Sequence, residues 1–143
     1  MRDLANNLDF KRALSPVAAL TNANTPFVST ILDTRDAGSV ALLIQLGAIT
    51  DADATLTVSM AESDASNMAG SNAVAASDMI GTLVLAGATF ANDDACRKIG
   101  YVGSKRYIQA TITPALNDVG SIFLSATWIL ARLNRAPTAN PPV

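Results

Sequence analysis

The sequence contains no histidine among its 143 residues. Histidine is the commonest general base near neutral pH and the commonest metal ligand, so its absence excludes a Ser-His-Asp triad in its usual form. The single cysteine, Cys96, excludes an internal disulfide and a cysteine-based zinc site. We expect Cys96 to be a small buried or half-buried residue, and we expect no enzymatic activity, no metal and no cofactor.

Charged residues, aromatic residues and long apolar runs are also scarce. Charged residues make up 15% of the chain and aromatic residues 5%, whereas a typical soluble domain has about 25% charged residues. A surface with so few charges is expected to be partly covered by neighbouring molecules. The longest apolar stretches, near Val40–Leu46 and Ile80–Ala88, are too short to cross a bilayer, and charges interrupt the N-terminal segment before a signal peptide could form.

The charges that are present are unevenly placed. Residues 51–94 contain seven acidic residues and no Lys or Arg, whereas the chain from Arg97 onward contains six basic residues and one acid, Asp118. Opposite charge patches steer association and fix the order of subunits. Two explanations stay open: charges scattered over a solvated face, and an acidic edge that meets the basic edge of a second copy.

The chain does contain a series of strand patterns separated by Gly, Asn and Asp. Residues 39–49 are apolar on both faces, which predicts a central strand, and residues 54–63 alternate between apolar and hydroxyl side chains. Short strands are expected over 79–85 and 88–90, after a long loop or weak helix over 63–77. This spacing predicts an all-β fold, namely a single β-sandwich or jelly-roll-like domain.

The clearest strand pattern runs from Ile99 to Leu130. An apolar row that alternates with polar residues precedes the turn at Pro114–Gly120, and a second apolar row follows it. The two rows are Ile108, Ala110 and Ile112, then Ile122, Leu124, Ala126, Trp128 and Leu130. We interpret the segment as two long antiparallel strands joined in a hairpin, with these rows, including Trp128, in the core.

The two ends of the chain differ from the part between them. Residues 1–26 show no sustained alternation and are compatible with a short helix over Leu4–Arg12, and the tail is rich in proline, which favours an extended path over a surface. We therefore divide the chain into an N-terminal arm (1–26), a β-sandwich domain (27–131) and an extended C-terminal tail (132–143). Deletion of residues 1–15 is then expected to leave the domain folded.

Other candidate sites each lack a required element. Four residues have the spacing of a calcium-binding EF-hand loop: Asp51, Asp53, Thr55 and Glu62. Leu56 occupies the position at which that loop needs glycine, although a looser divalent-ion site stays open at Asp51 and Asp53 or at Asp93 and Asp94. The glycines before Lys105 do not have the spacing of a phosphate-binding loop. No wider basic stripe supports a nucleic-acid surface around Lys105–Tyr107.

Several segments together resemble one family. An MRDLANNLDFKRALSP segment leads into FVSTILDT, and DDACRKIGYVGSKRYIQATITPA precedes a short Pro-rich tail. This arrangement resembles small proteins that tailed bacteriophages encode among their structural genes, close to the major capsid protein. The resemblance covers most of the chain, and IGYVGSKRYIQATIT is its most recognisable part. It implies a non-enzymatic component of the virion.

Within that setting the resemblance implies a head decoration (cement) protein. Such proteins typically form trimers on the outside of the capsid lattice and clamp neighbouring major capsid subunits. The implied partners are thus the major capsid protein and further copies of this chain, without nucleic acid or membrane. The implied location is the capsid surface, after assembly in the host cytoplasm. The residues expected to contact partners are Leu4, Leu8, Phe10, Lys11, Arg12, Lys105, Arg106, Tyr107, Arg132 and Arg135.

Two alternatives stay open. A head–tail joining or tail protein would assemble similar β-sandwiches as a ring. A carbohydrate-binding module on the virion surface would use exposed aromatic side chains as stacking faces, for which Tyr101, Tyr107 and Trp128 are the candidates.

Overall fold

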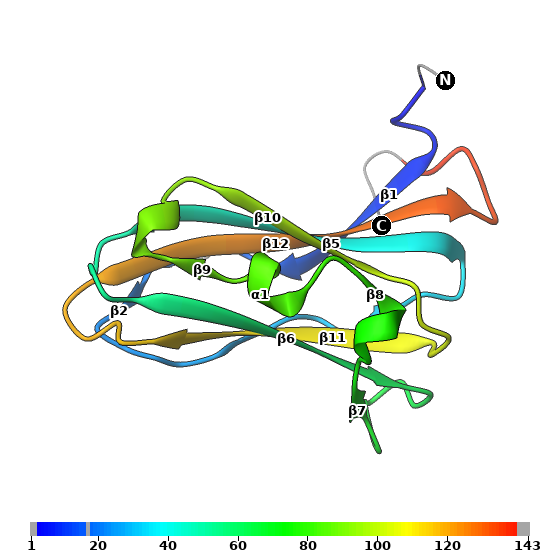
Figure 1. The fold of residues 1–143 in the computed structure, drawn as a ribbon. Coiled ribbons are helices and arrows are strands. Elements are labelled where there is room, and N and C mark those ends of the chain that lie inside the picture. Colours follow the sequence, from blue (N-terminus) through cyan, green and yellow to red (C-terminus); the bar gives the residue numbers. More distant parts are fainter. Residues whose placement is uncertain (1–2, 17, 140–143) are drawn as a thin grey trace.

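The structure, a computed structural model, describes residues 3–16 and 18–139 and is an antiparallel β-sandwich (Figure 1). The all-β prediction is therefore confirmed. The strands are β1 (Leu8–Leu14), β2 (Leu20–Thr21), β3 (Phe27–Val28), β4 (Leu32–Asp33), β5 (Ala37–Ile49), β6 (Thr55–Ser63), β7 (Asn72–Ala73), β8 (Met79–Ile80), β9 (Ala88–Thr89), β10 (Cys96–Tyr101), β11 (Tyr107–Ala115) and β12 (Ser121–Leu133). The helical elements are η1 (Ala76–Asp78), α1 (Leu83–Ala86) and η2 (Phe90–Asn92).

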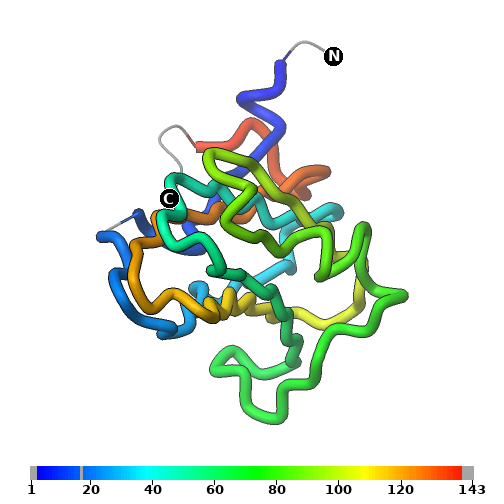
Figure 2. The backbone as a smooth tube through the Cα atoms, turned by 60° about the vertical axis from the view of Figure 1, so that its left-hand side comes forward, coloured from blue at the N-terminus to red at the C-terminus, as the bar shows by residue number. Residues whose placement is uncertain are grey.

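Two sheets form the layers of the sandwich, which Figure 2 shows from a second side. The first sheet, called sheet A, has the strand order β1-β12-β5-β10-β8, with β2 also paired to β12. The second, sheet B, has the order β3-β11-β6-β7, with β4 paired to β11 and β9 to β6. The predicted central strand is therefore β5, which lies between β12 and β10.

The core fills the space between the sheets with aliphatic side chains around one indole. Alternate residues are buried along most of β5, β6, β11 and β12, as the strand period predicts. Trp128 is fully buried, and its Nε1 donates to the carbonyl of Thr30 at 3.4 Å. The prediction that both apolar rows and Trp128 belong to the core is confirmed.

The predicted hairpin between these rows is wrong. β11 pairs with β6 in sheet B, whereas β12 pairs with β1 and β5 in sheet A. The two strands therefore face each other across the core and do not share hydrogen bonds as neighbours. Such an arch allows each apolar row to cover the other, whereas a hairpin would place both rows on one face of one sheet. Alternation alone does not distinguish these two arrangements.

Side chains brace the arch between β11 and β12. Asn117 is fully buried, and its amide nitrogen donates to the carbonyls of Leu20 and Ala23 at 3.2 and 2.9 Å. The Asp51 carboxylate accepts hydrogen bonds from the backbone amides of Asp118 and Val119 at 2.9 and 2.8 Å. The bond from the Val119 amide is the main cause that lowers the pKa of Asp51, while hydrogen bonding to Asp51 raises the pKa of Asp53.

Replacing Asp51 with Asn is expected to lower the free energy of unfolding near neutral pH, because the two amides lose a charged acceptor. The depressed pKa stabilises the fold above about pH 4, and this contribution is lost as the pH falls through the folded-state pKa. Urea titrations should therefore show the variant and the parent converging in acid. Asp53→Asn, the matched control, removes a like charge and should not destabilise. Equal losses in both variants would contradict this explanation.

The N-terminal segment belongs to sheet A. The expected helix over Leu4–Arg12 is wrong, because Leu8–Leu14 forms the edge strand β1, in register with β12 from Leu8 opposite Ala131 to Leu14 opposite Ala126. The boundary drawn at residue 26 therefore cuts through sheet A, and β12 continues two residues beyond the boundary drawn at 131. A bulge near Ala13 breaks the alternation of β1, which explains why the sequence did not reveal this strand.

Three smaller expectations are also corrected. The strand expected over 79–85 ends at Ile80, and α1 follows, with the Thr82 hydroxyl accepting from the Leu85 amide at its N-terminus. In the 63–77 segment, Asn72–Ala73 pairs with β6 as a strand where a weak helix was one alternative. Cys96 is exposed. Within the described ranges, no helix is long and apolar enough to span a membrane.

Candidate partner-binding surface

The segments next to the two chain termini, residues 5–8 and 134–138, lie side by side at one end of the sandwich (Figure 1). Thr138 joins them, since its amide donates to the carbonyl of Asn6 at 3.1 Å and its hydroxyl to that of Leu8 at 2.8 Å. The amide of Asn134 donates to the carbonyl of Asp36 at 3.0 Å. We call this region the terminal end; it comprises residues 4–8, 33–37, 104–107 and 132–138.

The predicted contact residues of the N-terminal segment are distributed along β1. Leu4, before the strand, is 67% exposed, and Phe10 is 41% exposed on the outer face of sheet A. Lys11 lies 3.2 Å from the Asp9 carboxylate, and Arg12 is exposed. Leu8 is half-buried. Leu4 and Phe10 are thus the apolar side chains of this segment that a partner could cover.

The predicted basic residues before β11 are bound within the chain. Arg106 donates twice to the Asp33 carboxylate, at 3.0 and 2.7 Å, and its guanidinium lies 4.9 Å from the centre of the Tyr107 ring. The hydrogen bond from Arg106 is the main cause that lowers the pKa of Asp33. Lys105 pairs with Asp64. These cations therefore neutralise acids of their own chain, which the sequence could not show.

Arg132 and Arg135 differ from Lys105 and Arg106. Both are exposed, and neither forms a salt bridge with any residue that the structure describes. Arg135 lines a hollow of about 420 Å³ together with Asp9, Leu133 and Thr138. A second hollow, of about 550 Å³, lies on the other side of β1 and is lined by Phe10, Lys11, Arg12, Thr30, Ile31, Leu32 and Asp33.

The structure thus brings most of the predicted contact residues to one region. Leu4, Leu8, the stretch Lys105–Tyr107 and the two C-terminal arginines lie at the terminal end, while Phe10, Lys11 and Arg12 continue from it along β1. The sequence did not identify Asp33 or Thr138 as part of this region. Their roles depend on hydrogen bonds to residues 73 and 130 positions away, which no local pattern reveals.

Five aspartates lie at the opposite end of the sandwich. The Asp93 carboxylate accepts from the amide of Ile49 at 2.8 Å, and Asp51 holds the loop that contains Asp118. We call this region the acidic end; its members are Asp51, Asp53, Asp93, Asp94 and Asp118. In the part of the chain that the structure describes, no group of three or more His, Cys, Asp or Glu side chains is placed to hold a metal ion.

The aromatic residues do not form a stacking platform for sugar rings. Trp128 is fully buried, and Tyr101 is buried with its hydroxyl donating to Glu62 at 2.7 Å. This burial is the main cause that raises the pKa of Tyr101. Tyr107 is half-buried next to Arg106. Trp128 and Tyr101 are therefore not accessible for stacking against a sugar ring. Tyr107 is only partly accessible.

Comparison with known proteins gives a distant structural similarity. The chain aligns with the crystal structure of the PBSX exported protein XepA at a TM-score of 0.50 and 15% identity, over 94% of this chain and 42% of that one. It also aligns with a structure of infectious bursal disease virus, Gx strain, at a TM-score of 0.43 and 10% identity, over 91% of this chain and 34% of that one.

A third similar structure is the C-terminal family 22 carbohydrate binding module of Clostridium thermocellum Xyn10B, with a TM-score of 0.41 and 10% identity over 94% of this chain and 92% of that one. The chain spans less than half the length of the first two proteins. No family model and no curated protein sequence matches the chain. At 15% identity the similarity to XepA shows a shared β-sandwich fold and nothing more.

Proposed function

We propose that the protein is a non-enzymatic structural component of a tailed-phage virion and, within that class, a head decoration (cement) protein. The proposal rests first on the family resemblance of the segments around IGYVGSKRYIQATIT. The fold is compatible with it, since XepA of PBSX, a phage-like element, has a similar β-sandwich. The single structural observation that supports the proposal is the terminal end, where residues 5–8 and 134–138 lie together and Leu4 is exposed.

Decoration proteins occupy many equivalent positions on the capsid lattice, and each copy binds through contacts that are individually weak. Exposed apolar residues beside unpaired cations suit such contacts, because apolar burial supplies affinity and charge fixes the orientation. Leu4, Phe10, Arg132 and Arg135 provide this combination. In the proposed assembly these residues contact the major capsid protein on the outer surface of the head.

Self-association is the second part of the proposal. The acidic end and the terminal end lie at opposite ends of β5, whose 13 residues separate them by about 40 Å. Arg132 and Arg135 at the terminal end of one copy can therefore approach the acidic end of the next copy. Such heterologous contacts close into a ring when the rotation permits, which agrees with the trimer that the resemblance implies.

Binding to capsids tests the proposal. Purified heads that lack this protein should take it up on addition and become more resistant to heat and osmotic shock. Leu4→Ser should weaken uptake severalfold, because it removes an exposed apolar contact without disturbing the core. Val28→Ser, at an exposed residue of β3 outside both the terminal end and the acidic end, is the matched control. Heads that remain unoccupied at saturating protein would refute the proposal.

A further inference from the structure

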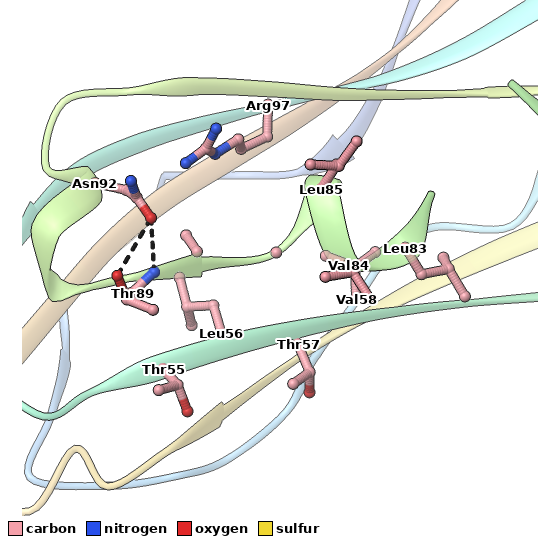
Figure 3. Close-up of a pocket in the computed structure, with 12 residues that line it drawn as sticks. Thr55, Leu56, Thr57, Val58, Leu83, Val84, Leu85, Thr89, Asn92 and Arg97 are labelled. Carbon is pink, nitrogen blue, oxygen red and sulfur yellow. Dashed lines mark hydrogen bonds between the residues drawn. The ribbon is translucent and has the colours of Figure 1, made fainter. Parts of the chain in front are cut away.

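We propose that a groove at the edge of the sandwich binds an extended segment of a partner protein that carries an Asp or Glu between aliphatic residues. The groove has a volume of about 430 Å³ and lies between α1, β6 and β10, away from the terminal end (Figure 3). This volume is within the range of about 300–1,000 Å³ that is typical of binding sites. Its walls combine an apolar side, one arginine and an unpaired stretch of β6. Each of these three features indicates one chemical property of the ligand.

The arginine specifies a carboxylate. Arg97 pairs in register with Ile44, so its side chain starts from the inward face of sheet A, where its neighbours along β10 are apolar. Its Nε is buried without a hydrogen-bond partner, and within the described ranges Arg97 forms no salt bridge. Buried donors in native proteins are almost always satisfied. A carboxylate binds a guanidinium through two parallel hydrogen bonds and would satisfy this donor once the Arg97 side chain shifts to expose its Nε.

The exposed helix specifies aliphatic neighbours for that carboxylate. Val84 and Leu85 of α1 are 87% and 69% exposed at the rim of the groove, and Leu56 and Val58 line it from β6. Figure 3 shows Arg97 and Leu56 on opposite sides, with Asn92 beside the guanidinium. A ligand that enters there must place apolar groups next to its charge.

The edge of β6 specifies an extended main chain. On the side away from β11, β9 pairs with Thr55 and Leu56 and β7 pairs with Ala61 and Glu62. Between them, Val58 has no strand partner on that side among the described residues, and it lines the groove. An added strand pairs its main chain with such a free edge and places alternate side chains in adjoining pockets. A peptide therefore fits all three features of the groove, whereas a small carboxylic acid would use only the arginine.

A random seven-residue peptide library displayed on yeast and screened against the full chain tests this proposal. Selected peptides should contain Asp or Glu flanked by aliphatic residues, and their addition should shift the NMR signals of the Val58 amide and the Arg97 Nε–H. Arg97→Gln should weaken binding at least about tenfold, as the loss of a charged hydrogen bond predicts. Lys98→Gln, which removes the adjacent outward-facing charge of β10, should bind as the parent does.

Val84→Asp provides a second variant that keeps the fold, because Val84 is almost fully exposed. Its added charge should also weaken binding of acidic peptides. The proposal is overturned if no peptides are enriched, if replacing their acid with the amide leaves affinity unchanged, or if acetate alone shifts Arg97 while no peptide shifts Val58. Each of these outcomes would leave the capsid-binding proposal standing, since that depends on the terminal end.

Discussion

Deleting residues 1–15 is expected to unfold the domain or to lower its free energy of unfolding by about 5 kcal/mol, given a net contribution of about 1 kcal/mol per lost hydrogen bond together with lost apolar burial. The deletion removes all of β1, which pairs with β12 along six positions of register. It also removes Ala13 and Leu14 from the core and exposes the edge of the strand that carries Trp128. A typical domain has only about 5–15 kcal/mol of stability in total.

Deletion of residues 1–6 is the matched control, because it keeps β1 complete. It removes the carbonyls of Ala5 and Asn6 that accept from Thr138 and the turn in which the Leu4 carbonyl accepts from the amides of Asn7 and Leu8. Chemical denaturation followed by tryptophan fluorescence measures both variants, since the chain has a single tryptophan. A 1–15 deletion as stable as the parent would show that β1 is a detachable arm, as the sequence had indicated. The role of this segment in partner binding is therefore better tested by Leu4→Ser than by truncation.

Replacing Trp128 with Ala is expected to cost about 3–5 kcal/mol, the range for the loss of a large buried aromatic side chain. The indole is fully buried between the sheets, and its Nε1 donates to Thr30, which in turn holds β1 through bonds to the carbonyls of Arg12 and Ala13. The substitution therefore leaves a cavity and also loosens the link between β1 and the segment before β4. The melting temperature should fall by about 6–20 °C, since each kcal/mol shifts it by about 2–4 °C in a domain of roughly 150 residues.

Phe123→Ala is the matched control on the same strand. Phe123 is 48% exposed on the outer face of sheet A, so its removal should cost about 1 kcal/mol or less. Calorimetry compares the two variants directly. Similar losses of stability in both variants would mean that burial of Trp128 in the core contributes no more to stability than the half-exposed Phe123 does.

The sequence predicted the strands of the core but not how they pair. The rows that contain Ile108 and Trp128 were identified correctly, because a period of two places alternate residues on one buried face. The sequence did not show that these two rows belong to different sheets, because apolar and polar residues alternate in the same way in an arch and in a hairpin. The arch is held by hydrogen bonds from the Asn117 side chain to the carbonyls of Leu20 and Ala23. These residues lie more than 90 positions away from Asn117 in the sequence.

The sequence also predicted only part of the candidate partner-binding surface, because contacts between distant residues leave no local pattern. Composition and the family resemblance indicated the chain ends, which do meet at the terminal end. The ion pairs of Lys105 and Arg106 with Asp64 and Asp33 depend on the fold, so the sequence could not show that these cations are already neutralised. Arg97 was noticed only as one of six basic residues. Its buried, unpaired Nε depends on the pairing of β10 with β5 in sheet A, which turns Arg97 toward the inward face.

The number of copies of this protein in each virion tests the central claim most directly. Quantitative mass spectrometry of purified particles, with the major capsid protein as internal reference, measures it. A decoration protein that occupies equivalent lattice positions should be present in copies on the order of hundreds, in a fixed ratio to the capsid protein. A count of about six or twelve copies would instead indicate a single ring at the head–tail junction or tail, and it would contradict the proposed function.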